Sequence, residues 1–445
     1  MKTSSSPELP EFPELPDAPP GATRPARRAR RAAALIAAAA AVVATAGAGV
    51  VRAGEGDGSQ IPVFVLFLDT PDVTVIGLTG IIDHGAVGGV RAYSIGTVAC
   101  NSGNLPLDWC DEPGGCGDGT SDEDHPVIAQ NLYRLAGGRF EQIGMSWLKH
   151  GFSSTNDPDP ACGDCVQPPL GSDQLGVGCT DTYSAGLNGS RPLGLRSEVA
   201  AATGDFPYPF TEVPAADRTS QRIRVAESDL DAALHPGARY WMEAHYIARD
   251  DAAAFKGFNN ASHREVTVGG GGSFGLGFTG ATARGLPAIA AWALADPEVD
   301  LVPVVVPRSR PPERFHVARK ATPTAGGWHY EYAVHNLHSD RSANSFTVAF
   351  PGGAAISNPG FHSIAHHSGE PYSSAPWAVD LSTPGAVTWS TDEFAAEPAA
   401  NALRWGTVFS FWFDSTAGPA TIEHTLGLFK PGSPAEIRFS MPVGE

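Results

Sequence analysis

The chain contains few charged residues and has a deficit of basic ones. Only 18% of its 445 residues are charged, and 30 Lys and Arg stand against 48 Asp and Glu, for a formal net charge of -18. Phosphate backbones and anionic membrane surfaces repel a protein of this charge. We therefore expect no nucleic acid partner, and no membrane partner once an N-terminal signal has been removed.

Several motifs that identify enzyme classes are also missing. The sequence contains no P-loop and no H-E-x-x-H zinc motif. Its glycine-rich run at 269–280 lies between strand-like segments and not in a β-α-β setting, which predicts a loop rather than a phosphate-binding turn. The motifs therefore assign no reaction to the chain.

Apolar runs of spanning length are lacking, with one exception near the N-terminus. Residues 32–51 are apolar, follow the basic stretch RPARRARR at 24–31, and lead into small residues that end at Ala53. This order is typical of an export signal, here cleaved after Ala53, and the Arg30-Arg31 pair is compatible with twin-arginine export. The alternative is an uncleaved anchor. We assign 1–53 to an N-terminal tail and signal segment, and expect the protein in the periplasm, at the cell surface or in the medium.

Cysteine is sparse but clustered. In an exported protein an even number of cysteines predicts disulfides, whose pairing the sequence leaves open. The C-x-x-C spacing of Cys162 and Cys165 leaves two alternatives, a zinc site completed by Cys179 and a histidine, or a redox pair. The predicted disulfide residues are Cys100, Cys110, Cys116, Cys162, Cys165 and Cys179.

Glycine and proline are abundant, with 51 and 38 residues, and they separate short runs of β-branched and aromatic residues. This pattern predicts an all-β fold. Gly137-Gly138 predicts a tight hairpin between two such runs. In its second arm Ile143, Met145 and Trp147 share the face that we expect to meet the core.

Two β domains follow the signal. We predict an irregular, disulfide-stapled β-rich domain at 60–300, a Pro-rich linker at 301–314 and an immunoglobulin-like or fibronectin-like β-sandwich at 315–440. In the sandwich, Tyr330 and Tyr332 alternate with histidines and a glutamate. We expect the aromatic face to be the core and the histidine face to be exposed.

The hairpin supplies a first candidate site. An imidazole beside a carboxylate and an ammonium group is suited to proton transfer or to anion binding. The alternative, which we favour, is cross-strand charge pairing on a solvated face. The candidate catalytic residues are His125, Glu141, Lys149 and His150.

Metal binding supplies two further candidates. Imidazoles on neighbouring strands of a sandwich are suited to copper or zinc, although histidines that face solvent would explain them equally well. An Asp-rich loop is suited to Ca²⁺, with a solvated acidic loop as the alternative, and no other cofactor is indicated. The candidates are His329, His335, His362, His366 and His367 for a transition metal, and Asp118, Asp122 and Asp124 for calcium.

Longer stretches of the sequence resemble a family of exported bacterial β-rich proteins with no assigned activity. The stretches are AYSIGTVACNSGNLPLDW, HPVIAQNLYRLAGGRFEQIGMSWLKHGF and LNGSRPLGLRSEV in the N-terminal part, and WHYEYAVHNLHSDRSANSF, GFHSIAHHSGEPY and NALRWGTVFSFWF in the C-terminal part. The likeness covers roughly 70–435. It implies export and a β-rich architecture, and it carries over no functional residue.

The leading hypothesis is therefore an exported structural or binding protein whose partner is a surface polymer or another protein. It rests on the export signal, the missing catalytic motifs and the frequent use of β-sandwiches as interaction modules. The alternative is a secreted copper- or zinc-dependent enzyme that uses the histidines of the C-terminal domain.

Overall fold

The all-β prediction is confirmed. The computed structural model describes residues 69–110, 125–419 and 422–441, in which strands dominate and helices are short. The predicted signal at 1–53 and the predicted calcium ligands Asp118, Asp122 and Asp124 lie outside the described residues. The helical segments are α2 (Ala185–Asn188), α3 (Arg249–Ala253), α4 (Ile289–Ala295), η1 (Gly171–Asp173), η2 (Arg196–Glu198) and η3 (Glu227–Leu230).

The N-terminal part forms one large antiparallel sheet, in the order β13-β12-β11-β4-β5-β10-β2-β9-β7, with β1 paired to β2 and β6 to β4. β3 (Leu107–Asp108) and β8 (Gln174–Leu175) form a separate pair. The strands of the large sheet are β1 (Val73–Val87), β2 (Val90–Asn101), β4 (Val127–Ala136), β5 (Arg139–Met145), β6 (Lys149–His150), β7 (Asp157–Pro158), β9 (Cys179–Tyr183), β10 (Ile223–Ala226), β11 (Arg239–Ile247), β12 (Ala261–Val268) and β13 (Leu276–Phe278).

The predicted hairpin is β4 and β5. Gly137 and Gly138 connect the strands with φ values of 58° and 87°, the left-handed conformations that a tight two-residue turn requires. The large sheet curls so that β1 meets β12. There Ser262 on β12 donates to the carbonyl of Val75 on β1 at 2.6 Å. One face of the sheet thereby encloses a core that includes Tyr93, Leu132, Met242 and Tyr246.

Two disulfides tie the irregular segment to this sheet. Cys100 on β2 pairs with Cys162, and Cys165 pairs with Cys179 on β9. Cys110 is also disulfide-bonded, and Cys116 lies outside the described residues. The two cysteines of the C-x-x-C stretch thus bond to different partners. The zinc site and the redox pair considered for them are both wrong.

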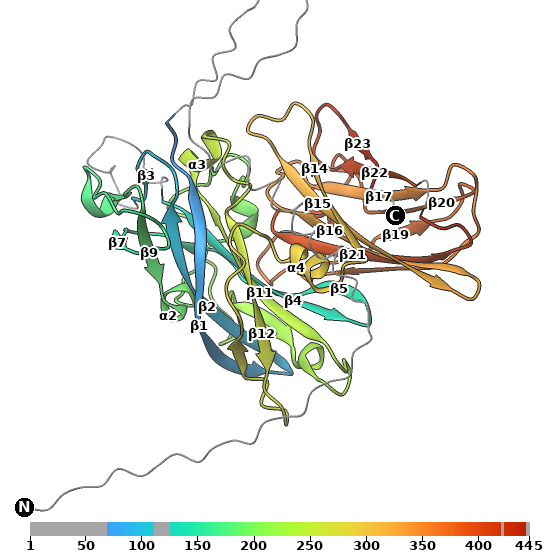
Figure 1. Ribbon diagram of the computed structural model, residues 1–445, viewed down its shortest axis with the longest axis horizontal. Coiled ribbons are helices and arrows are strands. Elements are labelled where there is room, and N and C mark those ends of the chain that lie inside the picture. The colour runs from blue at the N-terminus through green and yellow to red at the C-terminus, as the bar shows by residue number, and fades with distance from the viewer. Residues whose placement is uncertain (1–68, 111–124, 420–421, 442–445) are drawn as a thin grey trace, which may run out of the picture. The chain divides into compact units, whose positions relative to one another are not determined.

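The C-terminal part is a sandwich of two five-stranded antiparallel sheets (Figure 1). Tyr330 and Tyr332 meet Phe409 and Phe411 in its core, as the alternation of the two tyrosines predicted. The first sheet runs β14 (Val299–Val305), β15 (Arg314–Thr324), β16 (Gly327–Asn336), β21 (Thr407–Ser415), β18 (Ile356–Ser363); the second runs β19 (Ala378–Asp380), β20 (Ala386–Ser390), β17 (Ala343–Ala349), β22 (Glu423–Leu428), β23 (Glu436–Phe439).

The predicted linker at 301–314 requires a correction. Residues 301–305 belong to β14, which pairs with β15 along its whole length. Its Pro303 is tolerated because β14 is an edge strand, where a missing N–H leaves no gap in the ladder. The sandwich sheet therefore begins at Val299.

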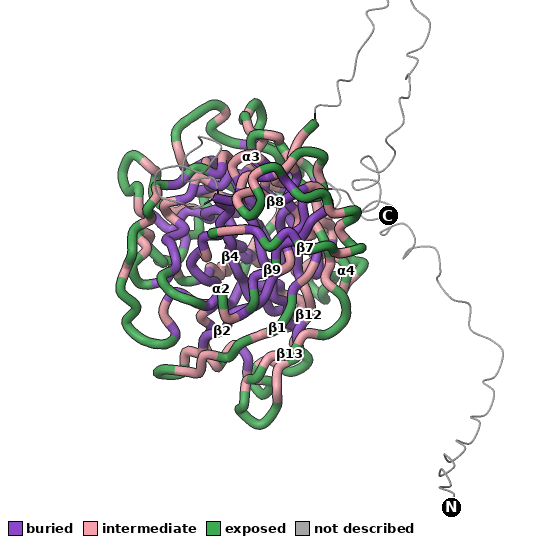
Figure 2. Tube along the Cα trace, turned by 90° about the vertical axis from the view of Figure 1, so that its left-hand side faces the viewer, coloured by how far each residue is buried: buried purple, intermediate pink, exposed green. Residues whose placement is uncertain are grey.

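The predicted solvated faces are buried, because the large sheet and the β15-β16-β21 sheet pack against each other. Phe140 and Trp241 of the large sheet share one apolar cluster with Ala333 and Val408 of the sandwich. Polar residues on these faces, among them Gln142 and His335, are buried as well. Figure 2 shows buried positions through the interior and exposed positions in the outer loops. We call the contact between the large sheet and the β15-β16-β21 sheet the polar seam.

Candidate functional site

The four catalytic candidates of the hairpin do not form one site. His125 and His150 form a pair, with Nε2 of His125 2.9 Å from Nδ1 of His150. Nδ1 of His125 donates to the carbonyl of Cys110, so its Nε2 accepts from His150. Burial, followed by the charges of His125 and Lys149, lowers the pKa of His150 to about 2. The rings of Phe206, Tyr208 and Phe210 pack around this pair.

Glu141 and Lys149 make other contacts. Glu141 receives a hydrogen bond from Arg134, directly opposite it on β4, at 2.6 Å. The predicted cross-strand pairing is therefore present, although the face is buried and not solvated. Lys149 lies over the ring of Phe152, 5.2 Å from its centroid.

The two strand histidines of the metal hypothesis are far apart. His329 and His335 lie six residues apart on β16, which corresponds to about 20 Å along a strand. His329 is held between Glu331 and Asp414, at 2.9 Å and 2.7 Å. Burial acts to lower its pKa, but its hydrogen bonds to these two carboxylates outweigh this effect and raise it. These two histidines cannot ligate one metal ion.

His335 lies instead in the polar seam, among three other buried imidazoles. Its ring stacks on His316 with the centroids 5.9 Å apart, and burial together with the charge of His338 lowers its pKa to about 3. Both ring nitrogens of His335 and of His245 lack hydrogen-bond partners among the described residues. Within the described residues, no three His, Cys, Asp or Glu side chains converge to hold a metal ion.

The remaining three histidines line a cleft of about 370 Å³. His367 anchors the cleft wall, since its Nε2 donates to the carbonyl of Met145 on β5 at 2.7 Å. Arg224 lies opposite Met145 on the neighbouring strand β10. The segment from His362 to His367 thereby faces β5 and β10 of the large sheet. The lining residues are Val90, Ile143, Met145, Arg224, Val225, Ala226, Asp229 and 362–367.

Arg224 is the distinctive group of this cleft. Among the residues that the structure describes, none accepts a hydrogen bond from its guanidinium group or forms an ion pair with it, although its Nε is buried. The nearby carboxylate of Asp229 is already bound by Arg134 at 2.9 Å. A buried polar group without a protein partner calls for an explanation, such as a bound ion or water molecule. The Arg224 cleft is therefore a candidate site for a hydrogen-bond acceptor such as an anion.

The imidazoles of the Arg224 cleft are neutral at neutral pH. Burial lowers the pKa of His366 to about 3 and of His367 to about 4, in both cases reinforced by nearby arginines. Burial also lowers the pKa of His362, against the opposing charges of Glu141 and Asp229. Nδ1 of His362 and Nε2 of His366 are buried and have no partner in the part of the chain that the structure describes. The cleft thus combines one fixed positive charge, neutral hydrogen-bonding rings and apolar walls.

Sequence reasoning found three of the cleft histidines but missed Arg224. In the run RIRVAE, Arg224 alternates with apolar residues like an ordinary exposed strand residue. The wall that it faces follows about 140 residues later, so no local pattern signals the cleft. A second pattern, GGSFG at 271–275, has the G-x-S-x-G spacing of a hydrolase nucleophile. Ser273, however, lies in the turn between β12 and β13 and donates to the carbonyl of Gly270, without the strand-to-helix setting that the motif needs.

Comparisons with known proteins add little. No family model matches the chain, and no curated protein matches it. One similar solved structure is described as a complete structure of manganese lipoxygenase of Gaeumannomyces graminis and a partial structure of zonadhesin of Komagataella pastoris. The match covers 82% of this chain and 92% of that chain at 9% identity, with a TM-score of 0.18, which is too low to support an argument.

A helix long and apolar enough to cross a membrane does not occur in the described ranges. The disulfides are typical of proteins that fold in an oxidising compartment outside the cytosol.

Proposed function

We propose that the protein is an exported binding protein whose ligand is a small organic anion held in the Arg224 cleft. The observation that carries the proposal is the guanidinium group of Arg224, which has a buried Nε and no partner among the described residues. The cleft volume of about 370 Å³ lies at the lower end of the range for small-molecule sites.

The charges of the cleft favour a monoanion. Arg224 is its one unpaired cation among the described residues, since the three imidazoles are neutral at neutral pH and Asp229 is bound by Arg134. A ligand with a second negative charge would meet the carboxylate of Asp229 without a matching cation. Ile143, Met145 and Val225 offer apolar surface to the rest of the ligand. A monocarboxylate with a short apolar body matches both the single positive charge and the apolar surface of the cleft.

Export is the second part of the proposal. The basic and apolar pattern of 1–53 supports a signal that is cleaved after Ala53. The disulfides support a final location in the periplasm, at the cell surface or in the medium.

Titration calorimetry on the chain from residue 54 tests the ligand at pH 7.5, with butyrate, benzoate and phosphate as separate probes. We expect a carboxylate to bind, and Arg224→Gln to weaken it about tenfold or more, because a charge-assisted hydrogen bond is lost. Arg438→Gln is the matched control, since Arg438 is an exposed arginine on β23. Equal carboxylate affinity of wild type and Arg224→Gln, or no binding of any probe, would contradict the proposal.

A further inference from the structure

Phe255 stands in a backbone position that disfavours it. It follows α3 with φ of +62°, the left-handed region in which a side chain is disfavoured. Its N–H donates to the carbonyl of Ala252, and that of Lys256 donates to the carbonyl of Asp251, at 3.0 Å and 3.1 Å. These two bonds form the helix ending in which glycine is the usual residue. The benzyl group of Phe255 is therefore not explained by the backbone.

Packing does not explain the benzyl group either. The residue is 49% exposed, whereas Phe258, three positions on, is covered by the guanidinium group of Arg314 at 3.5 Å from its ring centroid. Phe258 also contacts the ring of His338. Phe258 is thus an internal anchor, and Phe255 presents an aromatic ring to solvent.

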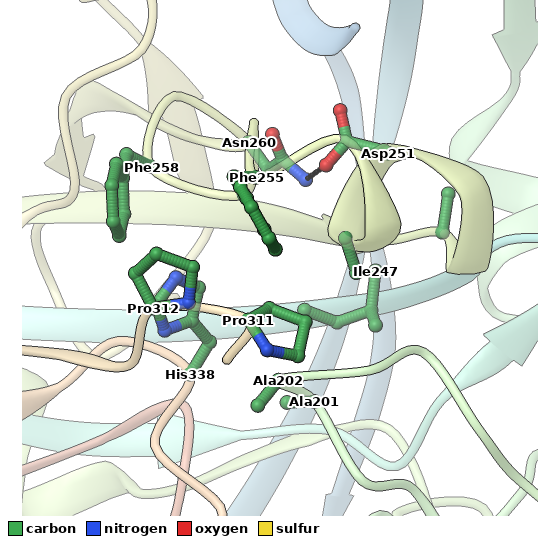
Figure 3. Close-up of a pocket in the computed structure, with 13 residues that line it drawn as sticks. Ala201, Ala202, Ile247, Asp251, Phe255, Phe258, Asn260, Pro311, Pro312 and His338 are labelled. Carbon is green, nitrogen blue, oxygen red and sulfur yellow. Dashed lines mark hydrogen bonds between the residues drawn. The ribbon is translucent and has the colours of Figure 1, made fainter. Parts of the chain in front are cut away.

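The ring of Phe255 borders an open hollow of about 420 Å³. Below it lies an inner cavity of about 10 Å³, room for roughly one water molecule. Phe255 and Pro311 line both spaces, and Figure 3 shows the ring of Phe255 pointing toward Pro311. These two residues therefore form the apolar floor of the hollow.

Asp205 and Arg249 form an ion pair that lines the same hollow. Asp205 accepts from Nε of Arg249 at 3.0 Å and from the hydroxyl of Thr203 at 2.6 Å. Gly204 makes this approach possible, because its φ is +79° and a Cβ there would lie 2.5 Å from Cα of Arg249. The side chain of Asp205 remains 56% exposed, so its carboxylate is available to a ligand.

We propose that this hollow binds a neutral saccharide chain, with one sugar ring stacked on Phe255. A pyranose has a C–H face that matches an aromatic ring, and hydroxyl groups at its edge that can donate to the exposed carboxylate of Asp205. The formal net charge of -18 disfavours an anionic polymer. The hollow shares no lining residue with the Arg224 cleft, so this second site is independent of the proposed anion ligand.

The test uses calorimetry on the chain from residue 54 with cellohexaose, maltohexaose and chitohexaose as probes, together with thermal unfolding. Wild type is expected to bind at least one hexasaccharide. Phe255→Gly should weaken that binding about tenfold or more, equivalent to about 1.4 kcal/mol, and should raise Tm, because glycine suits the left-handed position. Phe255→Tyr should retain binding without raising Tm.

Phe152→Ala removes an exposed phenylalanine from another surface and should leave saccharide affinity unchanged. Three results would overturn the proposal. They are the absence of binding to all three hexasaccharides, a lowered Tm of Phe255→Gly with saccharide binding retained, and binding of a decaproline peptide in place of the sugars.

Discussion

Arg196 and Arg224 carry the same charge but differ in how their donors are used. Arg196, in the polar seam, donates to the carbonyls of Ser146, Gly406 and Gln130 and to the side chain of Asn131. Arg224, in the cleft, donates to none of the described residues. A buried arginine whose donors have protein acceptors stabilises the fold, whereas one whose donors lack acceptors is available to a ligand.

Glu243, in the same polar seam, follows the pattern of Arg196. Glu243 accepts from Asn131, Tyr133 and the N–H of Ala288. Burial raises the pKa of Glu243 and lowers that of Arg196 to about 10. Arg196 and Glu243 therefore belong to a network in which the removal of either leaves buried partners unsatisfied.

The largest expected effect is the loss of Arg196. Arg196→Met leaves the carbonyls of Ser146, Gly406 and Gln130 buried without this donor, and should lower the free energy of unfolding by about 3–5 kcal/mol. Urea denaturation of the oxidised protein measures it. Arg196→Lys, which keeps the charge but not the forked geometry, should give an intermediate loss. A loss below about 1 kcal/mol for Arg196→Met would mean that Arg196 stabilises the fold no more than Arg224 does.

Gln142 tests the same network from the β5 side. Its Oε1 accepts from the N–H of Val408 at 2.8 Å, and its Nε2 donates to Asn131 at 3.0 Å. Gln142→Leu should reduce the free energy of unfolding by about 1–3 kcal/mol, because a buried N–H of the sandwich loses its acceptor. The same urea experiment checks it, and an unchanged midpoint would show that the seam tolerates unpaired groups.

The imidazoles make the polar seam sensitive to pH. In the folded state the pKa of His335 is about 3, below its unfolded value, so the unfolded chain binds the extra proton. The stability that neutral His335 contributes is complete above about pH 6.5 and is lost as pH falls toward 3, by about 1.4 kcal/mol per pH unit.

His335→Phe isolates this contribution. Asp250, whose pKa burial raises to about 7, acts in the opposite direction in both proteins and cancels in the comparison. The difference in unfolding free energy, wild type minus variant, should therefore rise from pH 4 to pH 6.5 and level off above it. A difference that is flat with pH would contradict a neutral His335 in the fold.

The smallest expected change in stability is at the cleft. Arg224→Met should alter the free energy of unfolding by no more than about 0.5 kcal/mol, because no described partner is left unsatisfied. Urea denaturation without added anion measures it. A loss above about 2 kcal/mol would mean that Arg224 is structural, like Arg196.

Local patterns predicted the elements of this fold well. Gly137-Gly138 gave the hairpin, and the alternation of Tyr330, Tyr332 and Val334 gave the sandwich core. Alternation has a period of two residues whatever covers the other face. It therefore could not reveal that Gln142 and His335 face a second layer of protein and not water.

Long-range features escaped prediction for a similar reason. The pairing of Cys100 with Cys162 depends on how the chain returns to β2, which residue spacing does not encode. Arg224 and His362 are brought together only by the packing of the sandwich on the large sheet. The composition of RIRVAE does not differ from that of an ordinary strand. The distance between His329 and His335, by contrast, follows from the rise of a single strand and is predictable from residue spacing alone.

The arrangement of the two disulfides has a consequence for proteolysis outside the cell. Val166, directly after Cys165, is 60% exposed, and the chain from there to Cys179 is a natural place for a protease to cut. Because Cys165 is bonded to Cys179, the two products of such a cut stay covalently joined. The nicked protein would migrate as one chain on a gel until a reductant separates it.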